Sequence, residues 1–145
     1  MQKIHIVCVG KIKEEFYRAA VAEYIKRLSR FAKTDICEIA EGINIEAEAG
    51  SILKNSRGKI VALCIEGDKY TSVEFAQFIK GVTVRGDECT FVIGSSYGLS
   101  DKVKKAAALR LSFSDMTFPH QLMRVILCEQ LYRAFMINGG GEYHK

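Results

Sequence analysis

Residues 111–120 read Leu-Ser-Phe-Ser-Asp-Met-Thr-Phe-Pro-His, and this stretch decides how the C-terminal half of the chain is organised. It begins as the end of a short apolar strand and continues through irregular residues. It then reaches Pro119, which suits the first turn of a long amphipathic helix. A loop of this kind leaves backbone donors and acceptors free to bind the edge of a flat heterocycle without charged side chains. We therefore expect a ligand site here.

Two other loops also follow apolar strands. Residues 90–93 lead into residues 94–99, Gly-Ser-Ser-Tyr-Gly-Leu, and an apolar run from residue 60 ends near residues 66–67. In open parallel sheets, ligands bind beyond the carboxyl ends of strands. The three loops would then form one pocket. Gly94 would let a ligand approach the backbone closely, because glycine has no Cβ.

The apolar residues follow the periods of strands and helices in alternation along the chain. This order predicts an α/β fold with a mostly parallel, five- to six-stranded sheet and helices on both faces, in a single domain spanning residues 1–145. We expect residues 81–86 to form a loop and a turn to follow the third strand at Gly67. The expected strands are residues 2–9, 34–40, 59–66, 89–93 and 110–113, and the expected helices are residues 14–31, 45–55, 72–80, 119–137 and a short one from residue 101.

The composition is that of an ordinary globular protein, with 48% hydrophobic and 26% charged residues among 145. No apolar run approaches the roughly 20 residues of a membrane-spanning helix, and the first residues enter a strand without a signal-peptide pattern. We expect a cytoplasmic protein with no membrane contact. The five cysteines are widely spaced in apolar runs and form no CxxC pair, which favours buried reduced thiols and no metal site.

Several common enzyme classes do not fit. Only Gly10 follows the first strand where a dinucleotide fold needs a glycine-rich turn, and no GxxxxGK[ST] sequence is present. Ser95 and Ser96 lack the GxSxG pattern of a serine hydrolase. No HExxH sequence or paired Cys/His set indicates a metal.

Charge is distributed unevenly along the chain. The formal net charge is +4, and basic residues concentrate towards both ends while the middle is acidic. Basic ends would suit a polyanion such as RNA, but ordinary solvated helix faces explain them equally well. We take Lys11, Lys13, Arg18 and Arg124 as candidate phosphate contacts, chosen by charge and expected exposure.

Several longer blocks resemble one known family. On these blocks essentially the whole chain is similar to the ribosomal RNA large-subunit methyltransferase H family of the SPOUT, or α/β-knot, superfamily. The blocks are FVIG at 91–94, GL at 98–99, LSFS at 111–114, MTFPHQ at 116–121, MRV at 123–125, EQLYRA at 129–134 and YHK at 143–145, with VCVGK at 7–11 and AEYIKR at 22–27.

The resemblance implies S-adenosylmethionine as cofactor and N3-methylation of a pseudouridine in 23S ribosomal RNA on the assembled ribosome, by a homodimer. It also implies a C-terminal trefoil knot, which no residue pattern predicts because threaded chains are nearly absent among folds. Carried over by position, the cofactor contacts coincide with the three strand ends grouped above. They fall on Leu63, Gly94, Phe113, Ser114, Asp115, Met116, Thr117 and Phe118.

The C-terminal residues carry the expected catalytic groups. His144 is the candidate general base and Tyr143 a group that stacks on or positions the RNA base, both reaching from one subunit over the pocket of the other. Without the resemblance, the three glycines before the tail would favour a mobile C-terminus. Glu129 and Arg133 are four residues apart on a helix, and we expect them to form an ordinary surface ion pair.

Two departures from the family pattern leave an alternative open. Ser95 stands where a second glycine commonly follows Gly94, and residues 139–141, Gly-Gly-Gly, are unusual before the final Tyr-His. A catalytically inactive RNA-binding module of the same fold is therefore the alternative. A flavodoxin-like domain also fits the order of elements, but it needs acidic or phosphate-binding loop residues that the sequence lacks.

Overall fold

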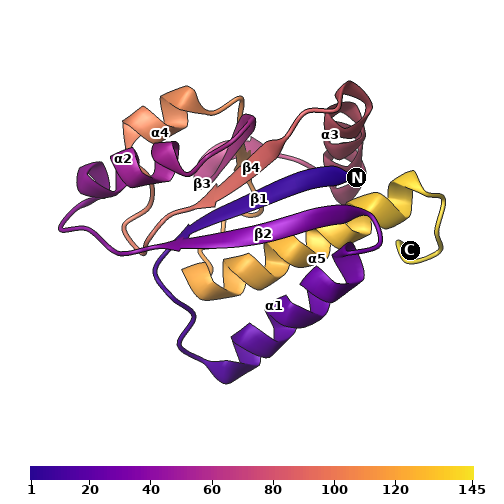
Figure 1. The fold of residues 1–145 in the computed structure, drawn as a ribbon, viewed down its shortest axis with the longest axis horizontal. Coiled ribbons are helices and arrows are strands. Elements are labelled where there is room, and N and C mark those ends of the chain that lie inside the picture. Colours follow the sequence, from indigo (N-terminus) through magenta and orange to yellow (C-terminus); the bar gives the residue numbers. More distant parts are fainter.

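The computed structural model describes residues 1–145 as five parallel strands in the order β2-β1-β4-β3-β5, with helices on both faces (Figure 1). This confirms the predicted α/β architecture, with five strands. The strands are β1 (Gln2–Val9), β2 (Ala32–Ile39), β3 (Lys59–Lys69), β4 (Cys89–Ile93) and β5 (Leu109–Ser112). The helices are α1 (Glu15–Leu28), α2 (Ile45–Lys54), α3 (Ser72–Arg85), α4 (Asp101–Ala106) and α5 (His120–Asn138).

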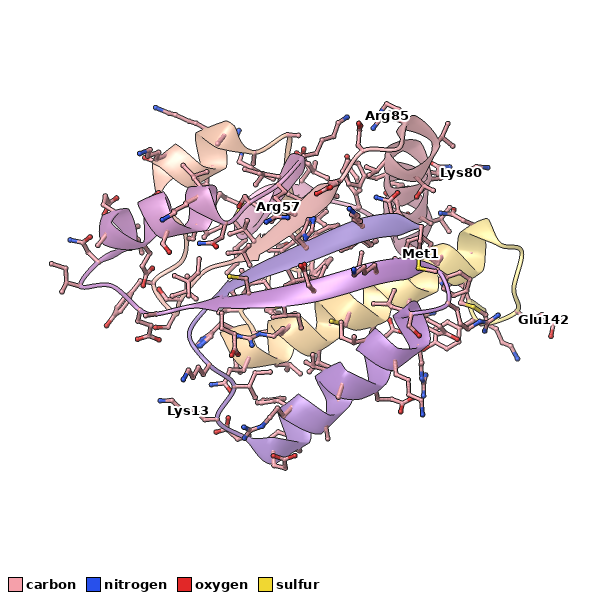
Figure 2. The ribbon with its side chains drawn as sticks, in the orientation of Figure 1. Met1, Lys13, Arg57, Lys80, Arg85 and Glu142 are labelled. Atoms are coloured by element: carbon pink, nitrogen blue, oxygen red, sulfur yellow. The ribbon has the colours of Figure 1, made fainter.

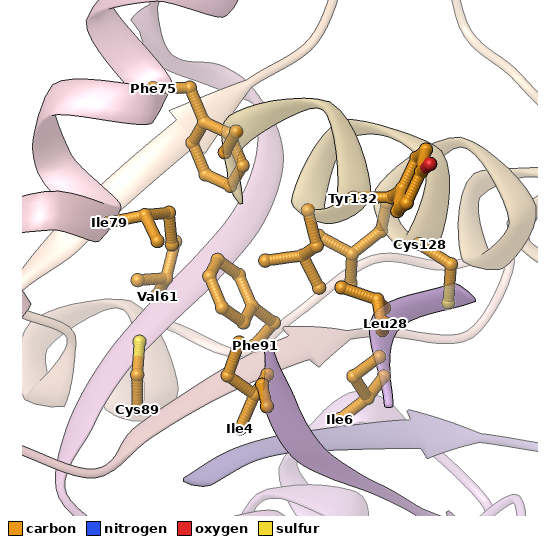
Figure 3. Close-up of a cluster of buried hydrophobic side chains, with 14 of the residues drawn as sticks. Ile4, Ile6, Leu28, Val61, Phe75, Ile79, Cys89, Phe91, Cys128 and Tyr132 are labelled. Atoms are coloured by element: carbon orange, nitrogen blue, oxygen red, sulfur yellow. The ribbon is translucent and has the colours of Figure 1, made fainter. Parts of the chain in front are cut away.

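Each face of the sheet has its own hydrophobic core, because successive strand residues point to opposite sides. Helix α5 packs between α1 and α3 on one face, while α2 and α4 pack together on the other. In the larger core, Phe91 of β4 lies among Ile4, Val61 and Phe75 (Figure 3), with 5.9 Å between its ring centroid and that of Phe75. Helices therefore cover both faces of the sheet, and a ligand can reach the strands only from an edge.

Helix α3 is longer than the sequence predicted. The loop expected at residues 81–86 is wrong, because α3 continues to Arg85 and is capped by Gly86. Val82 is buried and extends the apolar face that Ile79 begins. That burial outweighs the roughly 1 kcal/mol that a glycine such as Gly81 costs inside a helix.

Strand β3 also differs from the prediction, since it does not turn at Gly67 but continues to Lys69. Leu63 and Asp68 both pair with Leu111 of β5, so the residues between them bulge out of the ladder. The bulge lies at the carboxyl end of the sheet, beside the predicted pocket. Tertiary pairing with β5, which no local pattern reveals, therefore sets the length of this strand.

The backbone of β3 approaches that of β5 closely at Gly67. A Cβ on Gly67 would lie 2.7 Å from the carbonyl carbon of Arg110, so only glycine permits this approach of β3 to β5. After β5 the chain passes from the face that carries α4 to the face that carries α5. The close approach at Gly67 and this change of face together bring the loop after β5 to the edge formed by the carboxyl ends of the strands.

The cysteines are all free thiols. Cys8, Cys89 and Cys128 are buried, and burial raises the pKa of each to about 12, whereas Cys37 and Cys64 are half-buried. Three of the five are buried, as the sequence predicted, and two are only partly covered. No helix is long and apolar enough to cross a membrane.

The close approach at Gly67 can be tested by substitution. We expect Gly67→Ala to lower the free energy of unfolding by about 1–3 kcal/mol, as for other overpacked sites, because β5 would have to move. Gly50→Ala is the matched control: its Cβ would meet nothing within 4 Å on α2, so a gain of about 0.5–1 kcal/mol is expected. Urea unfolding measures both changes. Equal stability of the two variants would contradict the close approach.

Candidate active site

A cavity of about 350 Å³ opens at the carboxyl edge of the sheet, where the loops after β3, β4 and β5 meet the first turn of α5. The three strand ends grouped in the sequence analysis therefore do form one pocket. Its walls are mainly apolar side chains and exposed backbone. The lining residues are Leu63, Cys64, Ile65, Ile93, Gly94, Ser95, Ser96, Gly98, Leu111, Ser112, Phe113, Ser114, Met116, Thr117, Phe118, Pro119, His120 and Met123.

The structure brings all but one of the proposed cofactor residues to this cavity. Leu63 comes from β3, Gly94 from the end of β4, and the others from the loop after β5. Asp115 is the exception: it does not line the cavity, and its exposed carboxylate lies 2.5 Å from Nζ of Lys69. We infer that Asp115 holds the loop against β3, while its neighbours face the cavity.

The loop 113–118 leaves most of its backbone unpaired. Ser112 Oγ donates to the carbonyl of Ser114 at 3.1 Å, and the amide of Met116 donates to Ser114 Oγ at 3.0 Å. No other backbone group between residues 113 and 118 forms a hydrogen bond within the chain. Backbone groups beside a largely apolar cavity need partners, so this loop is suited to a ligand with donors and acceptors along a flat edge.

Gly94 has a different reason to be glycine from the one expected. A Cβ there would lie 2.4 Å from the carbonyl oxygen of Gly98, so a side chain would strike the loop itself before any ligand. The loop closes through an isolated bridge between Ser95 and Gly98. Ser95 is buried, and its Oγ donates to the buried carboxylate of Glu48 at 3.4 Å. The serine that departs from the family pattern therefore anchors the loop to α2.

The four candidate phosphate contacts divide into two groups. Lys11, Lys13 and Arg18 are exposed, as expected. Arg124 is only 2% exposed, so its prediction as an RNA contact is wrong. Its guanidinium lies 2.5 Å from the carboxylate of Glu38 and donates to the carbonyl of Gly10 at 3.2 Å. Arg124 thus fastens the loop after β1 to α5.

His144 and Tyr143 lie away from the cavity of their own chain. The cavity is at the first turn of α5, and the tail follows its last turn, about 28 Å further along for 19 residues. Figure 2 shows Lys13, whose amide bonds to Gln121 in the first turn, and Glu142, just before the tail, at opposite ends of the molecule. One copy of the chain therefore does not unite the catalytic and cofactor residues proposed from the sequence.

The tail is docked on α5. The hydroxyl of Tyr143 donates to Glu129 at 2.7 Å, and its ring meets the ring of Tyr132 edge-on with 5.0 Å between centroids. Burial, together with the hydrogen bond to Glu129, raises the pKa of Tyr143. The side chains of Glu129 and Arg133 are 18% and 24% exposed and hold the tail, so the expectation of an ordinary surface pair is wrong.

Some lining residues were not singled out from the sequence. Cys64 and Ile65 reach the cavity because β3 bulges between its two pairings with Leu111, and Met123 because it lies one turn into α5. His120 ends the stretch quoted from the sequence but was given no role of its own, and it lines the cavity. The sequence offered one indication of these residues: each lies next to a strand end or loop that had already been assigned to the pocket.

Comparison with solved structures defines the class of fold. A putative methylase family protein from Neisseria gonorrhoeae has a TM-score of 0.57 at 12% identity, covering 90% of this chain and 82% of that chain. A probable methylase family protein from Haemophilus influenzae has a TM-score of 0.61 at 14% identity, covering 94% and 66%. The A. aeolicus TrmH/SpoU tRNA modifying enzyme has a TM-score of 0.51 at 11% identity, covering 96% and 78%. This chain thus shares its fold with two methylase family proteins and a tRNA modifying enzyme.

The sequence comparisons then identify the family. The family described as "Predicted SPOUT methyltransferase" matches residues 2–144. The ribosomal RNA large subunit methyltransferase H of Streptococcus uberis is 47% identical over 99% of both chains, and that of Bifidobacterium animalis subsp. lactis is 50% identical over 98% of this chain and 99% of its own. The chain therefore belongs to the SPOUT methyltransferase family, among the ribosomal RNA large subunit methyltransferase H proteins.

This membership confirms the resemblance and makes the chain an S-adenosylmethionine-dependent methyltransferase. The SPOUT fold also implies the C-terminal knot expected from the resemblance.

The cavity fits the cofactor on three counts. Leu63 and Phe118 provide apolar walls for an adenine ring, the unpaired backbone of residues 113–118 can bind the edge of that ring, and no carboxylate lines the cavity. A positively charged sulfonium can lie against carbonyl oxygens without a fixed counter-ion. We would therefore expect main-chain atoms, more than charged side chains, to hold the molecule.

Cys64 offers a direct test of this site. It lines the cavity and is half-buried, and burial raises the pKa of its thiol; Cys37 on β2 is also half-buried but does not line the cavity. We expect S-adenosylmethionine to slow alkylation of Cys64 at least tenfold and to leave alkylation of Cys37 unchanged, as read by mass spectrometry of iodoacetamide-treated protein. Equal protection of both thiols, or of neither, would place the cofactor elsewhere. The buried Cys8, Cys89 and Cys128 should react slowly throughout, because their raised pKa removes the thiolate.

Proposed function

We propose that this chain, as a homodimer in the cytoplasm, methylates N3 of a pseudouridine in the 23S RNA of the assembled ribosome. The single domain of residues 1–145 would carry the whole activity. The relatives named above are ribosomal RNA large subunit methyltransferases and match this chain over nearly its full length. The observation in the structure that carries the proposal is the cavity lined by the unpaired backbone of residues 113–118.

The cofactor, when bound, supplies an electrophilic methyl group, so the protein has to align the acceptor and manage one proton. Leu63, Gly94 and the loop from Phe113 to Phe118 would hold the cofactor, with Asp115 supporting the loop from outside. Alignment of donor and acceptor can lower the barrier by about 7–11 kcal/mol in ideal cases. The acceptor N3 carries a weakly acidic proton, which must leave before or during transfer.

The arrangement of α5 supports a dimer. Leu122 and Ile126 are half-exposed apolar residues that do not join either core, and they lie four apart on one face of α5. Glu129 and Arg133, which hold the tail, continue the same face. A two-fold axis across this face would set two α5 helices antiparallel. The C-terminal end of each helix would then lie beside the N-terminal end of the other.

An antiparallel pairing would complete the site. The tail at the end of one α5 would meet the cavity at the start of the other, although the two are a helix length apart within one chain. His144 and Tyr143 of one subunit would thus contact an RNA base presented to the cofactor of the other. The exposed Lys11 and Lys13 lie on the segment between β1 and α1, at the cavity end of α5, and the exposed Arg18 lies near the start of α1. All three can contact phosphates.

The activity itself is tested on ribosomes that lack the modification. We expect the purified protein to transfer one radiolabelled methyl group to 23S RNA, and mass mapping of that RNA to place it on N3 of a pseudouridine. The His144→Ala variant should be at least 10²-fold slower. Tight ribosome binding without any methyl transfer by the wild-type protein would favour the inactive RNA-binding alternative.

A mixing experiment tests whether the site is shared between subunits. Leu63→Trp should fill the cavity and His144→Ala should remove a tail group, so each variant alone is expected to be inactive. After the two are mixed and allowed to exchange subunits, half the dimers should contain one intact composite site, giving about a quarter of wild-type activity by random pairing. Circular dichroism of each variant is the control for folding. Lack of any recovery despite subunit exchange would show that the tail serves its own chain.

A further inference from the structure

The contact between Arg133 and His144 fixes which ring nitrogen of His144 carries a proton. A terminal guanidinium nitrogen of Arg133 lies 3.0 Å from Nδ1 of His144. Arginine can only donate hydrogen bonds, so Nδ1 must accept. The proton of the neutral imidazole is then on Nε2. In this arrangement the outer nitrogen of His144 is a donor and has no lone pair with which to accept a proton.

The guanidinium of Arg133 is oriented by two neighbours, Glu129 and Tyr143, while His144 itself is exposed. Glu129 accepts from Nε of Arg133 at 3.1 Å and from one terminal nitrogen at 2.9 Å, which leaves the other terminal nitrogen for His144. The ring of Tyr143 lies 4.8 Å from the guanidinium carbon, and its hydroxyl donates to the same Glu129 carboxylate at 2.7 Å. Glu129 and the ring of Tyr143 therefore orient the guanidinium plane of Arg133 so that one N–H points at His144.

A histidine that acts as a general base usually shows the opposite arrangement. A carboxylate or carbonyl accepts Nδ1–H, which frees the lone pair of Nε2 to take a proton. No carboxylate pairs with the ring of His144. The charged and titratable groups around the tail are Glu129, Tyr132 and Arg133 on α5, Tyr24 and Arg27 on α1, and the chain neighbours Tyr143, Glu142 and Lys145.

We propose that Arg133 is a positioning residue that keeps His144 in the Nε2–H form, so that His144 donates a hydrogen bond to a carbonyl oxygen of the substrate base. This inference rests on the proposed function and replaces the role of general base expected for His144. The N3 proton of the base leaves to solvent, and the resulting negative charge is shared by N3 and its flanking carbonyl oxygens. The Nε2–H group stabilises that charge where it develops.

The electron count of the step is complete without another reactant. The electron pair on N3 forms the new bond to the methyl carbon, and the pair of the broken carbon–sulfur bond returns to sulfur, which becomes neutral. His144 keeps its proton throughout. A neutral donor suffices, because the base becomes anionic by losing its proton to water and not to the protein.

Substitution of His144 separates a donor from a base. The amide of His144→Gln retains an N–H donor near the position of Nε2 but cannot act as a base, so we expect it to stay within about tenfold of the wild-type rate on ribosomes. The Ala variant should lose about 10²–10³-fold, the usual cost of a missing charge-stabilising donor. Gln as inactive as Ala, with tail docking intact by hydrogen exchange, would overturn the donor role.

The rate as a function of pH gives a second readout. A histidine base would make the rate level off above its ordinary pKa of about 6.5. A donor would let the rate keep rising with pH as more of the RNA base loses its N3 proton. An inflection near 6.5 that disappears in His144→Gln would therefore overturn the inference. A wild-type protein that fails to methylate N3 at all would instead reject the proposed function.

The tautomer can be observed without activity. In protein with ¹⁵N-labelled imidazoles, long-range ¹H–¹⁵N spectra distinguish a protonated from an unprotonated ring nitrogen, and loss of the signal in His144→Ala separates it from His5 and His120. We expect the proton of His144 on Nε2, and a larger Nδ1–H fraction in Arg133→Met, which has no donor. Arg133→Lys, which keeps a donor, should restore the Nε2–H form. A wild-type spectrum with the proton on Nδ1 would contradict the proposal.

Discussion

The backbone contact between Gly67 and β5 is the constraint on which the site depends. It allows β3 to pair twice with Leu111, and the residues between the two pairings become a wall of the cavity. It also brings Lys69 to the loop after β5, where the ammonium group holds Asp115. Without room for this approach, the three loops would still end at one edge of the sheet. They would not enclose a common space.

Charge is used for support around this site and is nearly absent inside it. Arg124 is buried to tie the loop after β1 to α5, and the Glu48 carboxylate is buried beneath Ser95 to hold the loop after β4. In both cases the charged group lies outside the cavity lining, and uncharged groups face inward. A neutral lining suits a cationic methyl donor that must be bound and released in each cycle, since a fixed counter-ion would favour retention.

The sequence predicted the alternation of strands and helices and the grouping of three loops, because both follow from periodicity and the geometry of parallel sheets. The predictions were wrong where contacts between residues far apart in the sequence determine the structure. Residues 81–85 are helical because Val82 is buried, and Arg124 is inaccessible because Glu38, 86 positions away, pairs with it. Glu129 and Arg133 were misjudged because their partner is a tail whose docking has no periodic signature. The knot came only from resemblance, since local patterns carry no information on threading.

The order in which the pieces are made has a consequence for synthesis. The cavity needs the first turn of α5, and α5 takes its place only after the loop that follows β5 has passed across the edge of the sheet. A nascent chain that ends before His120 has all three loops but lacks the first turn of α5, so its cavity is not yet closed. Uptake of the donor would then coincide with completion of the threaded segment, so partly made chains would neither compete for the cellular supply nor occupy ribosomes unproductively.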